Sequence, residues 1–329
     1  MGWLLRRFLE WVNEPTPVLR IEIVRIFAPL AILGFMSGRI AHADEWIGDA
    51  GFHVPDLGGD WRQPLYIPAL PSWAAWTVAA AMVASGLACC LGVRTRASAI
   101  TFAATLVFVA LSDRLETYTV TKLSPAIMLA VASSPAGARL GVESTWKRRK
   151  TGKRPKRVRP IGAVRFLQLL VMVMYSASGI AKARGDWLKV PLVLWSHLHD
   201  SYQTGLSFAL ASVLPGWTWT VLQGLVLAFE LFAPIWLGLS RTRPWALVFG
   251  LSMHTMIGLM FGPVRWLALL MMTLLVAGYL PERLLGPLDA LAERLEPVKG
   301  RASRRTAGSR PERVHEEGQE DDELPGGDL

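Results

Sequence analysis

Long apolar runs occupy most of this chain, and the charged residues gather between the runs rather than within them. A helix that crosses a bilayer needs about 20 mostly apolar residues, with a range of about 17–25. The pattern therefore predicts an all-α fold, a polytopic transmembrane helix bundle with about eight spans. The predicted spans cover residues 20–40, 72–92, 97–112, 118–135, 161–182, 217–239, 244–262 and 264–280.

Composition agrees with this pattern. Only 19% of the residues are charged, against about 25% in a typical soluble protein. The chain also has 14 Trp, and several of them lie at the ends of apolar runs, where amphipathic rings reach headgroup depth. These include Trp73, Trp76, Trp187, Trp217, Trp219, Trp245 and Trp266.

Lys and Arg concentrate in alternate loops, and this asymmetry predicts the direction of the spans. Short cytoplasmic loops carry an excess of Lys and Arg. With an even number of spans, every basic loop lies on one side, so both termini are predicted to be cytoplasmic (N-in/C-in). The basic residues are Arg6, Arg7, Arg20, Arg94, Arg96, Arg241, Arg243 and Arg283, together with those of residues 139–160.

The loop 139–160 accounts for the high net charge. It holds ten Lys or Arg against one acid, Glu143, a local charge of +9 that equals the net charge of the whole chain. We interpret it as a cytoplasmic anchor beside anionic lipid, which makes membrane lipids the expected partners. No aromatic interleaving or fold motif accompanies the charges, so nucleic acid is not an expected partner.

The two ends of the chain carry different predictions. The start lacks the apolar core and cleavage site of a secretory signal, so the first span is expected to target the protein to the cell (cytoplasmic or inner) membrane. Residues 1–282 are predicted to form the transmembrane domain and residues 283–329 a cytoplasmic charged tail, largely disordered. From residue 297 the tail runs basic and then acidic without apolar periodicity.

Ionisable groups at membrane depth are costly and point to functional or structural roles. Glu230 lies within the sixth predicted span, four residues before Pro234, and His254 lies within the seventh. Two interpretations remain open: a catalytic pair that handles protons, and a helix–helix hydrogen bond that fixes packing.

Lys182 closes the fifth predicted span and is the third catalytic candidate. A lysine at the end of a span commonly snorkels to the interface, whereas a desolvated lysine can act as a base. Tyr175 lies on the same helical face, and with Gln168 it forms a polar stripe toward a substrate. Trp187 completes the predicted substrate-binding set of Tyr175, Gln168 and Trp187.

Other polar groups have simpler interpretations. Glu22 and Arg25 share one helical face, which predicts an internal ion pair. His197-x-His199-Asp200 has no distant third ligand, so no metal site is predicted. The adjacent Cys89 and Cys90 are interpreted as small packing residues.

Several strings in the chain are similar to one family. They are Arg165-Phe-Leu-Gln168, Met174-Tyr-Ser-Ala-Ser-Gly-Ile-Ala-Lys182, Gly185-Asp-Trp187, Gly92-Val-Arg94-Thr-Arg96, Phe229-Glu230-Leu-Phe-Ala-Pro234 and His254. Over roughly residues 15–282 the chain resembles the HTTM (horizontally transferred transmembrane) domain. That domain is the membrane part of vitamin K-dependent gamma-glutamyl carboxylase and of many bacterial proteins.

The resemblance implies a role for Lys182. In the carboxylases a Gly-Leu-Lys-Lys-x-x-x-Asp-Trp string carries two lysines, the second of which is implicated as the base in vitamin K epoxidation. Here Lys182 keeps the second position, and Ala181 replaces the first. The carboxylases' Asn-Asn-His-Ser-Tyr stretch has no match in residues 118–125, and no large lumenal region follows the last predicted span. A peptide carboxylase is therefore not expected.

Two functions from different classes follow. The first is a membrane enzyme that acts on a quinone-like or other lipophilic small molecule, with Lys182, Glu230 and His254 around an intramembrane cavity. The alternative is a non-catalytic module that binds a lipid or a partner membrane protein. A small transporter is a third possibility, but no internal repeat is visible to support it. The sequence identifies no cofactor.

Overall fold

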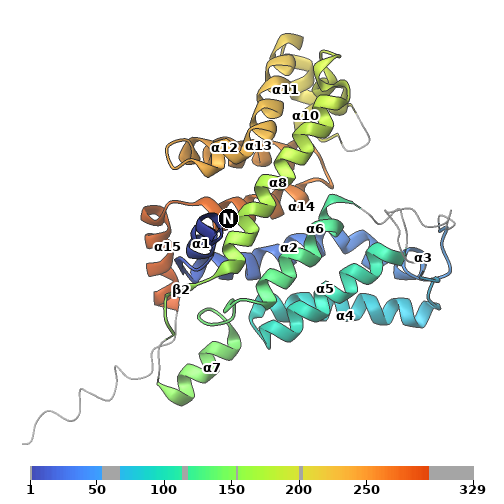
Figure 1. Ribbon diagram of the computed structural model, residues 1–329. Helices are drawn as coiled ribbons and strands as arrows, with labels where there is room; N and C mark the ends of the chain where they lie inside the picture. The colour runs from blue at the N-terminus through green and yellow to red at the C-terminus, as the bar shows by residue number, and fades with distance from the viewer. Residues whose placement is uncertain (1, 54–66, 113–117, 153–154, 200–202, 296–329) are drawn as a thin grey trace, which may run out of the picture. The chain divides into compact units, whose positions relative to one another are not determined.

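The computed structural model describes residues 2–53, 67–112, 118–152, 155–199 and 203–295. Helices dominate these ranges, as the apolar runs predict (Figure 1). The one sheet in them is a short antiparallel pair, in which β1 (Pro15–Pro17) runs against β2 (Val158–Pro160) with Thr16 opposite Arg159. The all-α prediction is confirmed.

Each of the eight predicted spans coincides with a helix. The sixth is broken: α11 ends at Leu231 and α12 (Ala233–Gly238) begins directly after it, with Pro234 in its first turn. Proline is well placed there because the first turn of a helix leaves its N–H groups unbonded anyway. The other helices are α2 (Leu19–Ala41), α4 (Ser72–Leu91), α5 (Thr95–Ser112), α6 (Thr119–Ala132), α8 (Gly162–Arg184), α11 (Gly216–Leu231), α13 (Arg243–Met260) and α14 (Arg265–Tyr279).

Within the described ranges, three helices, α4, α5 and α8, are long and apolar enough to cross a membrane. Two bent pairs raise this number to five if each pair is one span. They are α10 (Gly205–Val213) with α11, bent by 117°, and α14 with residues 282–293 of α15, bent by 105°. The chain is thus a polytopic helical protein by length and composition, while the count of eight and the N-in/C-in orientation remain predictions.

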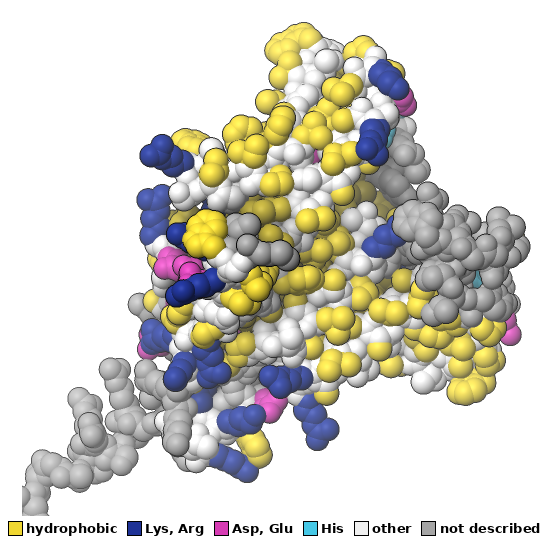
Figure 2. Space-filling model, in the orientation of Figure 1, with side chains coloured by type: hydrophobic (Ala, Val, Ile, Leu, Met, Phe, Trp, Pro, Cys, Tyr) yellow, Lys and Arg dark blue, Asp and Glu magenta, His cyan; other side chains and the backbone are white. Residues whose placement is uncertain are grey.

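The surface of the long helices is strongly apolar. In α4, α5 and α8, only 33–39% of the residues in the most apolar stretch are buried, and hydrophobic side chains cover much of the face in Figure 2. Trp73, Trp217 and Trp245 are exposed near the first residues of their helices, as predicted for interfacial rings. Trp219 departs from that prediction, because it is only 2% exposed.

The helices pack in two connected groups (Figure 1). α2, α4, α5 and α6 lie side by side, and α8 contacts α11, α12 and α14. α14 joins the groups because it packs against both α2 and α8. Most buried apolar residues of both groups form one continuous core, and a smaller separate cluster contains Leu198, Trp219 and Met260.

The charged residues at the start of α2 are buried but serve different partners. Glu22 Oε1 accepts hydrogen bonds from the amides of Arg139 and Leu140, at 2.6 and 3.0 Å. Arg25 Nη1 donates to the carbonyls of Cys89 and Cys90, at 3.0 and 2.5 Å. Among the described residues, Glu22 and Arg25 therefore form no ion pair with each other, and the predicted pair is wrong. Glu22 instead accepts from amides of the loop after α6, and Arg25 donates to carbonyls at the end of α4.

Two regions that the sequence presents as loops contain helices. The segment 183–216 holds the 3-10 helix η2 (Asp186–Leu188), α9 (Val193–His197) and α10. α7 (Val142–Thr151) lies in the basic loop. Two further short helices lie outside the predicted spans, α1 (Gly2–Val12) and α3 (Ala43–Trp46).

The predicted tail begins as a helix. α15 (Glu282–Leu295) continues beyond the expected boundary at residue 282, and Leu285 and Ala292 are buried with Leu19 of α2. Asp289 pairs with Arg139, and Glu293 pairs with Arg157. The compact helical unit that contains the predicted spans thus extends to about residue 296, and the remainder of the predicted tail lies outside the described residues.

Candidate functional site

The site begins with a close approach of α8 to α11. A Cβ atom on Gly179 would lie 2.7 Å from the amide nitrogen of Leu231 and 3.1 Å from Cβ of Glu230. Any larger residue would push the helices apart, so glycine permits this crossing. One turn further along α8, the same face carries Lys182.

Lys182 and Glu230 form the charged pair of the site. Lys182 Nζ donates to Glu230 Oε1 at 2.5 Å. The second oxygen, Oε2, is buried and has no hydrogen-bond partner among the described residues. The ammonium of Lys182 also lies 4.7 Å from the ring centroid of Trp187, a cation–π contact. The structure therefore brings two of the three predicted catalytic residues into direct contact, and one predicted binding residue beside them.

The pair borders a large apolar cavity between α11, α13 and the segment 183–216. Its volume is about 860 Å³, which lies within the range of about 300–1,000 Å³ typical of small-molecule pockets. Lys182 and Glu230 are the charged side chains in the described part of its lining. The rest is almost entirely hydrophobic and includes Leu198, Trp219, Leu222, Val226, Met256 and Met260.

Gln223 ties the segment 183–216 to α11 at the edge of this cavity. Its Nε2 donates to the carbonyls of Trp187 and Val190, at 2.7 and 3.1 Å, and its Oε1 accepts from the amide of Leu194 at 3.1 Å. The side chain is only 3% exposed. Gln223 is not among the residues predicted from the sequence, although an amide within an apolar run is itself a signal of buried polar contacts.

His254 and Tyr175 form a second pair behind the cavity wall. Tyr175 Oη and His254 Nε2 are 2.7 Å apart, and the two rings are 5.9 Å apart. Tyr175 also packs edge-on against Phe229, the neighbour of Glu230. Neither residue is part of the cavity lining. The predicted meeting of Glu230 with His254 is thus replaced by two separate pairs on the same three helices.

Gln168 lies at the other end of α8. It precedes Lys182 by 14 residues, about 21 Å along a helix. Its Nε2 donates to the carbonyl of Gly278 at 2.5 Å, and its backbone carbonyl accepts from the hydroxyl of Tyr279 at 2.6 Å. It lines a separate polar cleft. Gln168 therefore does not contact the cavity beside Lys182.

The histidines of the segment 183–216 hold helix carbonyls. His197 Nδ1 is 2.9 Å from the carbonyl of Val193, and His199 Nδ1 is 2.9 Å from that of Trp195. In the described ranges no group of three metal-binding side chains occurs. His197 does line the apolar cavity, a position that the sequence pattern did not predict.

These observations define a polytopic helical membrane protein with an ion pair at the wall of an apolar cavity. The sequence profile of the HTTM domain matches residues 14–278, which is most of the chain. The chain belongs to the HTTM domain family, as the resemblance implied. Neither the curated proteins nor the solved structures contain a match to it.

Proposed function

We propose that this protein is a membrane enzyme that acts on a lipophilic, quinone-like molecule held in the cavity beside Lys182 and Glu230. The observation that carries the proposal is the ion pair at the wall of a cavity of about 860 Å³ whose remaining described lining is mainly apolar. Such a combination suits a molecule with an apolar body and one polar end. The cavity would take the body, and the pair would meet the polar end.

The chemistry available to the pair is proton transfer. The Lys182 ammonium can donate a hydrogen bond and a proton to a carbonyl oxygen of the ligand. Glu230 Oε2 has no partner among the described residues and can accept a proton from a ligand hydroxyl. His254 touches Tyr175 rather than the cavity, so we assign it a positioning role through Tyr175 and Phe229.

The alternative is a module that binds a lipid or a partner membrane protein without chemistry. It is favoured by the fact that the two charges already satisfy each other at 2.5 Å and that Lys182 also rests on Trp187. A paired lysine of this kind orients helices without any substrate. The two functions differ in whether the pair changes a bound molecule.

The test is to identify what the cavity holds. The protein is purified in mild detergent, and the lipophilic molecules that accompany it are extracted and quantified by mass spectrometry. Val226→Phe adds a ring to the cavity lining, whereas Val221→Phe places the same ring on an exposed position of α11. We expect a stoichiometric lipophile in the wild type and in Val221→Phe, and its loss in Val226→Phe.

Equal recovery from all three proteins would contradict binding in this cavity. To separate the enzyme from the module, the identified molecule is incubated with wild-type protein and with Glu230→Gln in proteoliposomes. Conversion by the wild type alone supports catalysis. Retention of the unchanged molecule by both proteins supports the alternative.

A further inference from the structure

A second cavity lies at the end of the molecule that carries the basic loop. Its volume is about 690 Å³. Four segments build it: the turn before α5 with the first residues of α5, the loop 134–138, α7, and the stretch that includes β2. Figure 2 shows that Lys and Arg side chains gather around α7 and α15 at this end. It is separate from the apolar cavity beside Lys182, because the two linings share no residue.

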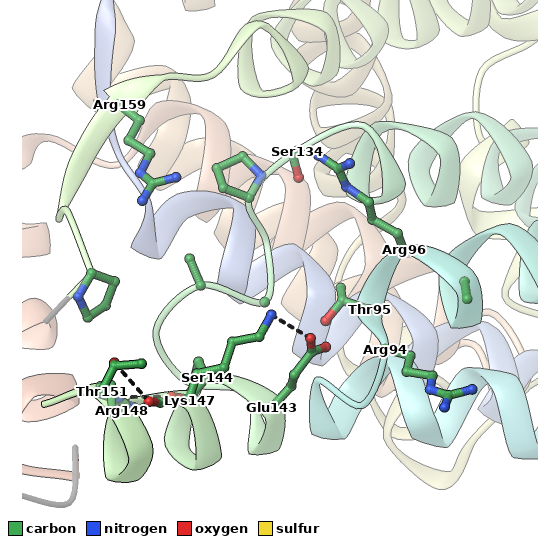
Figure 3. Close-up of a pocket in the computed structure, with 15 residues that line it drawn as sticks. Arg94, Thr95, Arg96, Ser134, Glu143, Ser144, Lys147, Arg148, Thr151 and Arg159 are labelled. Atoms are coloured by element: carbon green, nitrogen blue, oxygen red, sulfur yellow. Dashed lines mark hydrogen bonds and ion pairs between the residues drawn. The ribbon is translucent and has the colours of Figure 1, made fainter. Parts of the chain in front are cut away.

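The lining of this basic cavity has a strong excess of positive charge. Among the described residues, the lining includes five Lys or Arg and one acid, Glu143, which is already paired with Lys147 at 2.6 Å. Figure 3 shows Lys147 and Arg159 directed toward the middle of the cavity, whereas Arg94 extends away from it. Arg159 Nε is buried and has no hydrogen-bond partner among the described residues. Such a cluster is unfavourable unless an anion is near.

Backbone geometry adds to the positive field. α5 begins at Thr95 on the cavity wall. The first turn of a helix exposes N–H groups, and the dipole places partial positive charge there, so this position favours an anion. Gly92 and Arg94, both with positive φ, make the tight turn that aims the start of α5 at the cavity.

Thr95 supplies an independent indication of a ligand. Its side chain is 7% exposed, and its hydroxyl is buried without a partner in the described structure. Buried hydroxyls are almost always hydrogen-bonded, so an orphan in a cavity wall indicates a missing acceptor or donor. An anion in the basic cavity would accept this hydrogen bond.

The surroundings indicate what the anion belongs to. Val93, Val142 and Trp146 neighbour the lining residues in sequence and are 39%, 54% and 57% exposed. Apolar side chains beside a cationic pocket are typical of elements at the membrane interface. We propose that the basic cavity binds a phosphate group, carried either by an anionic phospholipid or by a soluble phosphate compound. This site is independent of the function proposed for the Lys182 cavity.

The test uses the full-length protein in neutral detergent and its apparent melting temperature. In one arm, dioleoylphosphatidylglycerol is titrated against dioleoylglycerol, which has the same chains but no phosphate. In the other arm, inorganic phosphate is titrated against chloride at equal ionic strength. We expect the apparent melting temperature to rise saturably with phosphatidylglycerol and to stay unchanged with dioleoylglycerol. A rise in the inorganic arm as well would identify free phosphate as a sufficient ligand.

Variants locate the binding. Arg96→Gln with Arg159→Gln removes two lining charges. It should raise the half-saturating concentration of phosphatidylglycerol about tenfold or more, since each charge-assisted contact is strong. Arg149→Gln with Lys150→Gln is the matched control, because it also removes two positive charges and both residues are exposed on α7 outside the lining. Thr95→Val keeps the side-chain shape and should also weaken binding without harming the fold, since its hydroxyl has no partner to lose.

Two results would overturn the proposal. One is that neither phosphatidylglycerol nor inorganic phosphate gives a saturable rise of the apparent melting temperature beyond that of its phosphate-free comparison. The other is an equally large rise of the half-saturating concentration in the Arg149→Gln, Lys150→Gln control, which would assign the effect to net charge alone. If the double variant does not fold, unchanged binding by Thr95→Val would overturn the proposal in its place.

Discussion

At the scale of single residues, the Lys182–Glu230 pair sets the strongest constraint. Glu230 is 6% exposed, so loss of its partner leaves a carboxylate buried without compensation. Lys182→Met should lower the free energy of unfolding by about 1–3 kcal/mol. Lys182→Met combined with Glu230→Gln removes both charges and should regain part of that loss.

Thermal unfolding of Lys182→Met, Glu230→Gln and the double variant in one detergent measures this coupling. Lys189→Met, at an exposed position of the same segment, is the control and should unfold as the wild type does. Additive losses in the double variant would argue against a compensating pair.

Tyr175 offers a second test at this scale. Tyr175→Phe keeps the ring that packs on Phe229 but removes the hydroxyl that lies 2.7 Å from His254 Nε2. The remaining Nδ1 of His254 already has no partner among the described residues, so the imidazole would be left unsatisfied. We expect a loss of about 1–2 kcal/mol, against no change in Tyr118→Phe, whose side chain is exposed. Loss of the ligand from the Lys182 cavity of Tyr175→Phe would support a positioning role for His254, and full retention of the ligand would contradict that role.

At the scale of elements, Gly179 controls how closely α8 approaches α11. Gly179→Ala places a methyl group 2.7 Å from the amide nitrogen of Leu231, which forces the helices apart. The expected cost is about 1–3 kcal/mol, together with loss of the accompanying lipophile. Gly224→Ala on α11 meets no atom within 4 Å and should be neutral or slightly stabilising, by less than about 1 kcal/mol. Similar behaviour of the two variants would show that the crossing tolerates bulk.

The helices could be predicted from the sequence, but the partners of their polar side chains could not. The eight helices were predictable because spans are continuous apolar runs. The break between α11 and α12 was not part of that prediction, although Pro234, which lacks an N–H, gives it a local cause. The partners of polar groups were not predictable. Glu22 bonds to amides of the loop after α6, and Gln168 to the carbonyl of Gly278. Periodicity places a residue on a face, but these partners lie more than a hundred residues away.

α15 makes a further element-scale prediction. Its Asp289 pairs with Arg139, whose side chain is 1% exposed. Asp289→Asn removes the negative charge beside a buried guanidinium, so α15 should detach more often from α2 and the basic loop. Hydrogen exchange of the amides in 282–293 should be faster, while exchange in α5 stays unchanged. Glu282→Gln, an exposed acid on the same helix, is the control. Unchanged exchange in Asp289→Asn would show that Leu285 and Ala292 hold the helix by packing alone.

At the scale of the whole molecule, the two cavities are bordered by segments on opposite sides of α8 in the sequence. The apolar cavity is bordered by the segment 183–216, which follows α8, and the basic cavity by the loop that precedes α8. α8 is long and apolar enough to cross a membrane. If it does, the two cavities open toward opposite sides, and the orientation of the chain decides which one meets the cytoplasm.

Orientation is testable with single cysteines in a Cys89→Ala, Cys90→Ala background. Arg7→Cys, Arg149→Cys, Lys189→Cys and Arg283→Cys all replace exposed residues. With eight spans and both ends inside, a membrane-impermeant maleimide added to intact cells should label only the Lys189 position, because the Lys and Arg excess keeps the other three in the cytoplasm. All four should react after permeabilisation. An odd number of spans would separate Arg7 from Arg283, so labelling of one terminus alone in intact cells would refute the eight-span arrangement while leaving the helices themselves unchanged.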